Sequence, residues 1–194
     1  MSTPPAAVIA VAAPPGGGKT TLVRQLSSRL GSAPVLHYDE FQEMTRRSAP
    51  EVEAWLDRGA PLAEIPLPRF LESVLALKHG GARYVLLDFL LARAHPATAP
   101  HIDFVIWIEL APDLALARML RAQIAIAMRG PAAGRAQLVE WLGPYLESYE
   151  RLLHRSYELQ RARVRPQADL VVDGSLTPER QADLAAAAIR ARFP

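Results

Sequence analysis

The 194-residue chain contains no cysteine. This excludes disulfide bonds, thiolate metal sites and a cysteine nucleophile, and it is typical of a reducing compartment, so we expect a cytoplasmic location. Charge of one sign is also lacking, because 22 Lys and Arg against 20 Asp and Glu leave a formal net charge of +2. Without a run of five or six like charges, the sequence predicts no nucleic-acid partner.

Long hydrophobic runs are missing as well. No segment reaches the roughly 18 apolar residues that a membrane helix needs, so we predict no membrane partner. Residues 6–13 are small and apolar, but no Lys or Arg precedes them and they lead directly into a glycine-rich stretch. They are therefore interpreted as a buried strand and not as a signal peptide. The length predicts one domain, residues 1–194.

Apolar, strand-like runs alternate with helical patterns along the chain. This alternation is typical of an α/β fold in which helices cover both faces of a parallel sheet. The expected strands are residues 6–12, 35–38, 84–87, 104–108 and 169–172. The expected helices are residues 19–30, 51–58, 69–78, 112–128 and 137–160, and a last one capped by Thr177. In the segment 137–160, Trp141, Tyr145 and Tyr149 recur at helical spacing and predict a stripe that faces the core.

The strongest motif is residues 13–20, Ala-Pro-Pro-Gly-Gly-Gly-Lys-Thr. It fits the phosphate-binding pattern Gly-x-x-x-x-Gly-Lys-Ser/Thr with Ala13 at the first position. Glycines let backbone N–H groups converge on phosphates, Lys19 can reach the β- and γ-phosphates, and the Thr20 hydroxyl can bind Mg²⁺. The alternative, a chance glycine-rich turn, is disfavoured because a strand precedes the motif and a helix follows it. The predicted cofactors are ATP and Mg²⁺, contacted by Ala13, Gly16, Gly17, Gly18, Lys19, Thr20 and Thr21.

Two acids follow predicted strands. Asp39 comes after the second strand and Asp88 closes the third. Ligands of an open parallel sheet bind beyond the carboxyl ends of its strands, so both carboxylates are expected near the phosphate loop. Asp39 could accept the proton of a substrate hydroxyl or hold Mg²⁺, and Asp88 could hold Mg²⁺ together with Thr20. The alternative for each is a solvated acid at a strand end.

Several segments together resemble the uridine kinase and phosphoribulokinase family of small-molecule P-loop kinases. They are residues 13–20, 37–41, 103–109 with 112–118, and 145–157 with 168–172. They occur in the order of the family and cover most of the chain outside residues 48–68. The phosphate loop is the one specific motif among them.

The resemblance implies a three-layer P-loop NTPase fold with a five-stranded parallel sheet. It implies ATP-dependent phosphorylation of a small-molecule hydroxyl, with Lys19 and Asp39 as catalytic residues and residues 48–68 as a substrate-binding insertion. It also implies a lid, residues 118–135, that brings Arg118 or Arg121 over the transferred phosphate. The chain departs from the family here, because Arg121 is followed by Ala-Gln where the family tends to have an Arg-Asp pair.

Several alternatives stay open. A nucleotide-binding switch or ATPase that regulates a protein partner is a second interpretation, although the guanine-specifying Asn-Lys-x-Asp is absent. The acceptor could be a nucleoside, a sugar or a coenzyme precursor, the nucleotide could be ATP or GTP, and a homodimer is left open. The cluster Arg161, Arg163 and Arg165 could lie near the adenine base or form a solvated basic turn.

Overall fold

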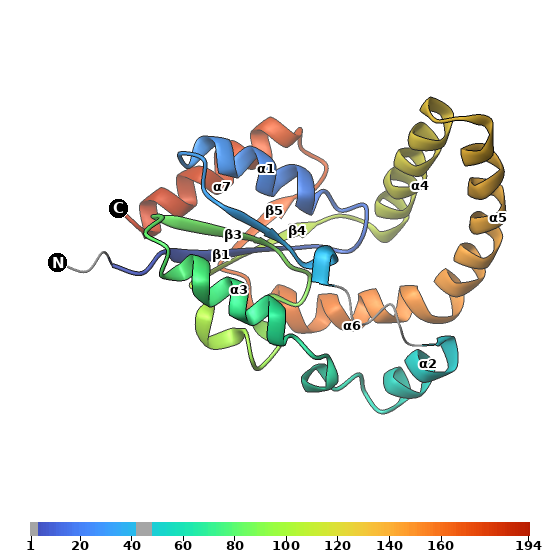
Figure 1. Ribbon diagram of the computed structural model, residues 1–194, viewed down its shortest axis with the longest axis horizontal. Coiled ribbons are helices and arrows are strands. Elements are labelled where there is room, and N and C mark those ends of the chain that lie inside the picture. Colours follow the sequence, from blue (N-terminus) through green and yellow to red (C-terminus); the bar gives the residue numbers. More distant parts are fainter. Residues whose placement is uncertain (1–3, 42–47) are drawn as a thin grey trace.

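The structure is a computed structural model that describes residues 4–41 and 48–194. Its centre is a five-stranded parallel sheet with the order β2-β3-β1-β4-β5 (Figure 1). The strands are β1 (Ala7–Ala12), β2 (Val35–His37), β3 (Tyr84–Asp88), β4 (Phe104–Glu109) and β5 (Leu170–Asp173). The predicted α/β fold with a five-stranded parallel sheet is confirmed, and each strand lies within a residue or two of its expected position.

Helices cover both faces of the sheet. The long ones are α1 (Lys19–Arg29), α2 (Ala49–Asp57), α3 (Pro68–Lys78), α4 (Pro112–Arg129), α5 (Ala132–Ser148), α6 (His154–Val164) and α7 (Pro178–Arg192). Single turns of 3-10 helix are η1 (Tyr38–Phe41), η3 (Leu62–Glu64), η4 (Ala92–Ala94), η5 (Ala99–His101) and η7 (Arg165–Gln167). None of the helices in the described ranges combines the length and the apolar character needed to cross a bilayer.

The alternating side chains of the central strands build two separate cores. Ile9 and Val11 of β1 pack with Leu22 of α1 and Ala185 of α7 on one face. Residues one position along the strand, such as Val8, face the opposite way and join the core beneath α3 and α6. Because side chains of a strand alternate between faces, a continuous apolar run such as that of β1 fits a strand buried on both sides.

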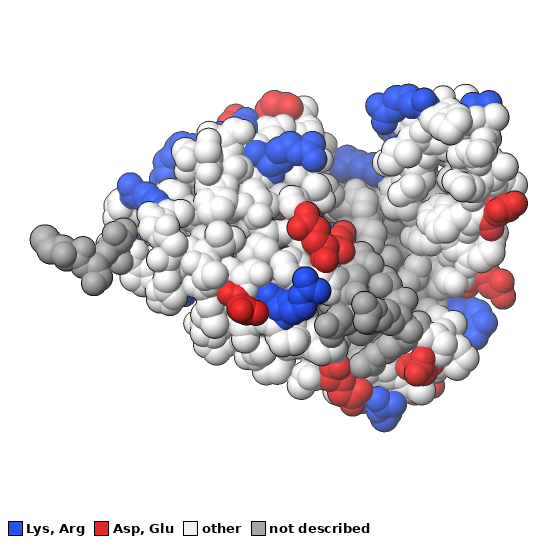
Figure 2. Space-filling view, viewed as in Figure 1, with Lys and Arg blue, Asp and Glu red and all other residues white. Residues whose placement is uncertain are grey.

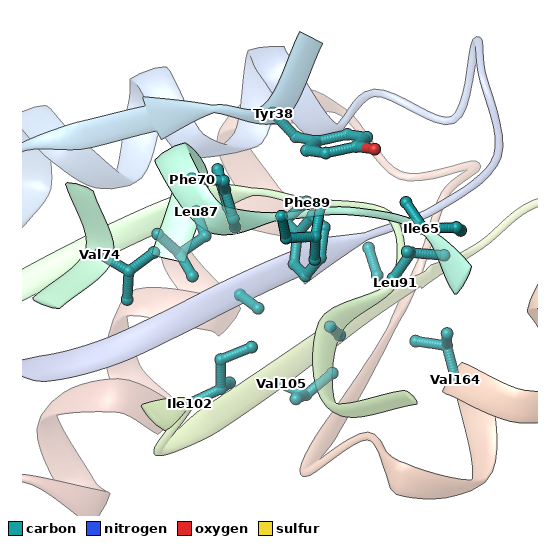
Figure 3. Close-up of a cluster of buried hydrophobic side chains, with 14 of the residues drawn as sticks. Tyr38, Ile65, Phe70, Val74, Leu87, Phe89, Leu91, Ile102, Val105 and Val164 are labelled. Carbon is teal, nitrogen blue, oxygen red and sulfur yellow. The ribbon is translucent and has the colours of Figure 1, made fainter. Parts of the chain in front are cut away.

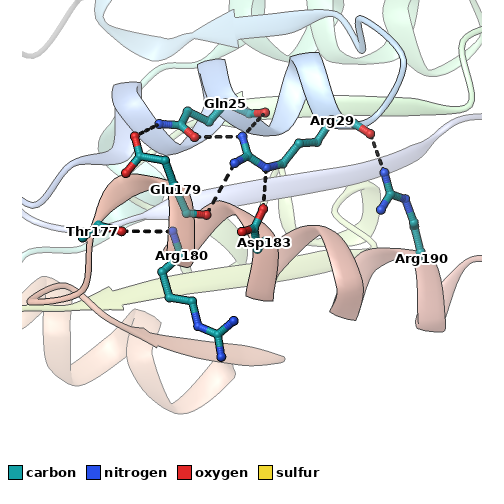
Figure 4. A network of polar contacts seen from close by, with 7 residues as sticks. All are labelled: Gln25, Arg29, Thr177, Glu179, Arg180, Asp183 and Arg190. Carbon is teal, nitrogen blue, oxygen red and sulfur yellow. Dashed lines mark hydrogen bonds and ion pairs between the residues drawn. The ribbon is translucent and has the colours of Figure 1, made fainter.

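Polar contacts tie α1 to α7 at the surface of the first layer (Figure 4). Arg29 Nε donates to Asp183 Oδ1 at 2.9 Å, and Arg190 donates to the backbone oxygen of Arg29 at 2.6 Å. The Thr177 hydroxyl accepts a hydrogen bond from the backbone N–H of Arg180, which confirms Thr177 as the cap of α7. These contacts fix the helix that follows β5 against the helix that follows the phosphate loop.

The second core contains an aromatic cluster near the ends of β2 and β3. The ring of Tyr38 lies edge-on to Phe70 and Phe89, with centroids 5.6 and 5.1 Å away, and Figure 3 shows the three rings together. Edge-to-face packing of aromatic rings adds to the stabilisation that comes from burial. The cluster anchors the turn that carries Asp39, the residue after Tyr38.

Helices α4 and α5 form an arm that projects beyond the sheet (Figure 1). The single helix expected at residues 137–160 is wrong in its bounds: α5 begins at Ala132, a π-helix (Tyr149–Leu153) follows it, and α6 continues to Val164. The core stripe is also wrong for α5, which has no buried residue, and Trp141 is 38% exposed. Trp141 stacks on Tyr145 with ring centroids 4.5 Å apart, and α5 packs against α4.

Candidate functional site

The loop between β1 and α1 turns sharply because two of its glycines adopt positive φ. Gly16 has φ 80° and Gly18 has φ 97°, values that side-chain-bearing residues rarely take. Gly16 is also held by its surroundings, because a Cβ there would lie 2.0 Å from the backbone oxygen of Ala115 in α4. The loop is therefore seated against the first turn of the arm.

The first turn of α1 can receive an anion. Gly18 is the N-cap residue of α1, and no side chain makes a capping hydrogen bond there. The first backbone N–H groups of a helix lack intrahelical partners and carry the positive end of the helix dipole, so such a turn is suited to bind phosphate.

Lys19 folds back onto the loop that precedes it. Its amine Nζ donates to the backbone oxygen of Ala13 at 2.8 Å, and the oxygen of Pro14 lies 3.5 Å away. Burial lowers the pKa of this amine below its ordinary value of 10.5, while the charges of Asp88 and Asp39 act in the opposite direction. A phosphate placed in the loop would supply the negative charge that a buried ammonium group needs.

The Thr20 hydroxyl and the Asp88 carboxylate meet at the carboxyl edge of the sheet. Thr20 Oγ1 donates to Asp88 Oδ2 at 2.6 Å, and His37 Nδ1 lies 3.2 Å from the same oxygen. Asp88 itself is 6% exposed. Thr20, which is predicted to bind Mg²⁺, is thus in direct contact with Asp88, one of the two predicted acids.

The donor set of this corner fits Mg²⁺. Mg²⁺ prefers oxygen ligands and is usually held by one or two carboxylates together with water and substrate phosphates. Thr20 and Asp88 supply a hydroxyl and a carboxylate. The described residues hold no cluster of three or more His, Cys, Asp or Glu side chains able to bind a metal, so the remaining ligands would come from phosphate and water.

A cavity of about 570 Å³ opens above the loop. Residues 15–22 of the loop and α1 form its floor, and Asp39 lines it beside Leu90. Figure 2 shows the surface hollowed between the body and the α4–α5 arm, with Lys or Arg atoms inside the hollow. The volume falls within the range of small-molecule sites, about 300–1,000 Å³. Thr21, which is exposed, also lines this cavity, whereas Ala13 is fully buried beneath it.

The structure separates the two arginines expected in the lid. Arg118 lines the cavity, and its Nη1 donates to the backbone oxygen of Gly174 at 2.8 Å. Arg121 lies one turn further along α4, is exposed, and is not among the described residues that line the cavity. The neighbours of Arg118 that do line it are Met119, Ala122 and Gln123.

Sequence reasoning missed the wall of the cavity that α7 and the turn before it supply. Leu176, Pro178 and Gln181 line the cavity directly after β5. The sheet itself carried the signal: all five strands are parallel, so the residue after every strand reaches the same edge. Leu176 and Pro178 make this side of the cavity apolar, and Arg118 contacts the same turn through the backbone oxygen of Gly174.

The basic cluster before β5 does not reach the cavity. Arg161 and Arg165 form ion pairs with Glu109, and Arg163 donates to the backbone oxygens of Gly59 and Ala60. Arg161 and Arg165 are exposed, as expected of a solvated basic turn, and the cluster also joins α6 to β4 and to the segment after α2. A position near the adenine base stays a prediction.

Three solved structures share the fold of the chain. A sugar kinase from a Janibacter species matches with a TM-score of 0.54 at 19% identity, over 96% of this chain and 95% of that one. A gluconokinase from Sinorhizobium meliloti matches with a TM-score of 0.52 at 14% identity, over 100% and 95%. A shikimate kinase from Aquifex aeolicus matches with a TM-score of 0.51 at 17% identity, over 95% and 97%.

These matches establish the fold, a five-stranded parallel sheet flanked by helices as in P-loop kinases. No protein-family model matches the sequence, and no curated protein matches it. The resemblance to small-molecule P-loop kinases therefore holds at the level of fold. The finer likeness to uridine kinases stays a prediction from the sequence.

Proposed function

We propose that the protein is an ATP- and Mg²⁺-dependent phosphotransferase that moves the γ-phosphate to a hydroxyl of a small molecule. One observation carries the proposal. The glycine loop with Lys19, the Thr20–Asp88 pair and Asp39 all lie around a single cavity of about 570 Å³ or in contact with its lining.

Each of these residues has a separate proposed role in binding or transfer. Backbone N–H groups of the loop and Lys19 would bind the β- and γ-phosphates, and Thr20 and Asp88 would hold Mg²⁺. When bound, the metal supplies charge neutralisation on the phosphate oxygens. Asp39 lies at the cavity with its carboxylate exposed, where it can orient an acceptor hydroxyl and accept its proton.

The arm would complete the site. Arg118, Met119 and Gln123 line the cavity from α4, so movement of the arm changes the width of the cavity. Closure of such an element over a nucleotide excludes water and positions the phosphate for in-line transfer. On this basis residues 118–135 are proposed as the lid, and residues 48–68, which contain α2 and η3, as the acceptor-binding region.

The names of the proteins with similar folds support a small-molecule kinase function. They are called a sugar kinase, a gluconokinase and a shikimate kinase, names that describe phosphorylation of a small molecule. A soluble small-molecule acceptor is accordingly the partner that we propose. A cytoplasmic location and a homodimer stay predictions.

The test is ADP release from the purified protein with Mg-ATP, measured with and without candidate acceptor alcohols. We expect stimulation by an acceptor that is lost in Lys19→Ala and reduced in Asp39→Asn. Asp183→Asn is the matched control, because this carboxylate is exposed on α7, bonds Arg29 and does not line the cavity.

Two outcomes would contradict the proposal. Full acceptor-stimulated activity in Lys19→Ala would show that the loop has been assigned wrongly. A slow ATP turnover that no acceptor changes, but that a protein partner does, would favour a nucleotide-dependent switch.

A further inference from the structure

A second cavity lies beside the phosphate cavity. Its volume is about 230 Å³, and it lies between the α2–η3 region and α6. Pro15 and Leu90 line both cavities, so the two meet at these residues. Tyr38 lines the second cavity and is the neighbour of Asp39 in the sequence. This part of the second cavity therefore lies close to Asp39, the proposed general base.

Most of the side chains that line this cavity are apolar, and several of them are buried. Trp55 and Ile65 are 4% and 3% exposed, and Val164 is 1% exposed. Binding sites for small molecules are concave and lined mainly by apolar side chains with a few polar groups. An apolar cleft of this size beside a phosphate site is therefore suited to a small apolar ligand.

Three of the polar side chains that line the cavity donate hydrogen bonds to the protein itself. The indole N–H of Trp55 donates to the backbone oxygen of Pro61 at 3.2 Å, and Gln160 Nε2 donates to that of Leu90 at 2.6 Å. Arg163, the one charged side chain among the described lining residues, donates to Ala60 and Gly59. The other polar side chains of the described lining are the hydroxyls of Tyr38, Ser156 and Tyr157, of which Tyr157 is hydrogen-bonded to Tyr145. The lining therefore offers no further charged group to bind a carboxylate and few groups to bind several hydroxyls.

We infer that the phosphate acceptor is an uncharged alcohol built on an apolar ring, with the ring in this cavity and the hydroxyl directed past Pro15 and Leu90. The inference rests on the proposed kinase function. A sugar or polyol fits poorly, because each hydroxyl buried without a partner costs about 1–3 kcal/mol. A cavity of about 150 Å³ lined by aliphatic and aromatic side chains binds benzene, so the space here suffices for one substituted ring.

The transfer step balances within the proposed site. The acceptor oxygen forms a bond to the γ-phosphorus, and the bond from that phosphorus to the β–γ bridging oxygen breaks. The hydroxyl proton passes to Asp39, and ADP leaves with the electron pair of the broken bond. Neither an oxidant nor a further co-reactant is needed.

The experiment compares ring alcohols with polyols as acceptors at equal concentration. Benzyl alcohol and 2-phenylethanol represent the first class, and glucose, gluconate and glycerol the second. We expect ADP release to be stimulated by a ring alcohol. Leu159→Gln, which places an amide in the lining, should raise KM for the alcohol about tenfold and leave KM for Mg-ATP unchanged.

Leu153→Gln is the matched control, because Leu153 is also partly buried in the same helical stretch but does not line the cavity. It should leave KM for the alcohol within about twofold of the wild-type value. An equal rise in both variants would point to a general loss of structure and would overturn the inference.

A binding measurement separates failure of the inference from failure of the kinase function. Toluene has the ring but no hydroxyl, so it should raise the Tm of the wild-type protein and not that of Leu159→Gln. If toluene binds but no alcohol is phosphorylated, the cavity does bind an apolar ring, but the proposed kinase function is contradicted. If a polyol is phosphorylated with the higher kcat/KM, the kinase function stands and the inference fails. If neither toluene nor a ring alcohol has any effect, the inference is overturned.

Discussion

The Thr20 hydroxyl donates a 2.6 Å hydrogen bond to Asp88, across 68 positions of the sequence. This contact joins the first turn of α1 to the end of β3, the strand next to β1 in the sheet. It places the Thr20 hydroxyl beside the Asp88 carboxylate at the point where the phosphate loop ends and α1 begins. A hydroxyl and a carboxylate at this position are compatible with the proposed binding of Mg²⁺ and phosphate.

Removing the Thr20 hydroxyl should impair use of Mg²⁺. We expect Thr20→Ala to lower ATP turnover about 100-fold or more, and to raise the Mg²⁺ concentration for half-maximal activity. Thr20→Ser keeps the hydroxyl and should retain most of the activity. A Mg²⁺ titration of ADP release compares the three proteins, and an unchanged Mg²⁺ dependence in Thr20→Ala would exclude this residue as a ligand.

The contact of the loop with the arm can be tested at Gly16. Both Gly16 and Gly31 have positive φ, 80° and 75°, but only at Gly16 would a Cβ meet a backbone atom, the oxygen of Ala115 at 2.0 Å. Gly31→Ala should therefore cost only the backbone strain, about 1 kcal/mol of unfolding free energy. Gly16→Ala should cost about 1–3 kcal/mol more, because the loop and α4 must move apart. Urea denaturation measures both, and equal losses would contradict the contact.

The sequence was sufficient for the fold because each strand carries its own signal. β1 and β3 are continuous apolar runs bounded by turn residues, and such runs predict strands buried on both faces. The Gly-Lys-Thr motif fixed the position of the loop, and the parallel arrangement placed Asp39 and Asp88 at the same edge.

The arm could not be predicted in the same way. Its apolar spacing fits a helix that faces a core, but the spacing does not say which partner covers that face. In the structure Trp141 stacks on Tyr145 within α5, and the helix packs on α4 beyond the end of the sheet. The parallel sheet places Leu176 and Pro178 at its carboxyl edge, but no sequence motif marks these single apolar residues as part of a cavity wall.

Glu109 gives the fold a pH dependence that can be measured. Partial burial raises the pKa of its carboxyl group, but hydrogen bonds from Arg161 and Arg165 outweigh this effect and hold the pKa below its ordinary value of 4.5. A carboxyl group whose pKa is lower in the folded protein stabilises it above the unfolded value, and this contribution disappears as pH falls through the folded value.

Glu109→Gln should therefore lower the unfolding free energy by about 1 kcal/mol at pH 7, and by progressively less as pH falls below 4.5. Urea denaturation at several pH values provides the measurement. Glu53→Gln is a suitable control, because Glu53 pairs with Arg151 at the surface, where both side chains are about half exposed. A difference between wild type and Glu109→Gln that persisted unchanged at acid pH would contradict the role of the arginine pairs.

Two of the arginines of α4, Arg118 and Arg121, distinguish an open arm from one that closes over the phosphate. Arg118 lines the cavity and bonds Gly174, whereas Arg121 is exposed outside it. If this arrangement persists through turnover, Arg118→Ala should raise KM for ATP about tenfold, since a charge-assisted contact of this kind contributes about 1.4 kcal/mol or more. Arg121→Ala should then change kcat and KM by less than about twofold. If Arg121→Ala instead lowers kcat and leaves KM for ATP unchanged, Arg121 acts only in the transition state. The arm must then rotate or close during the reaction, because the exposed guanidinium could not otherwise reach the transferred phosphate.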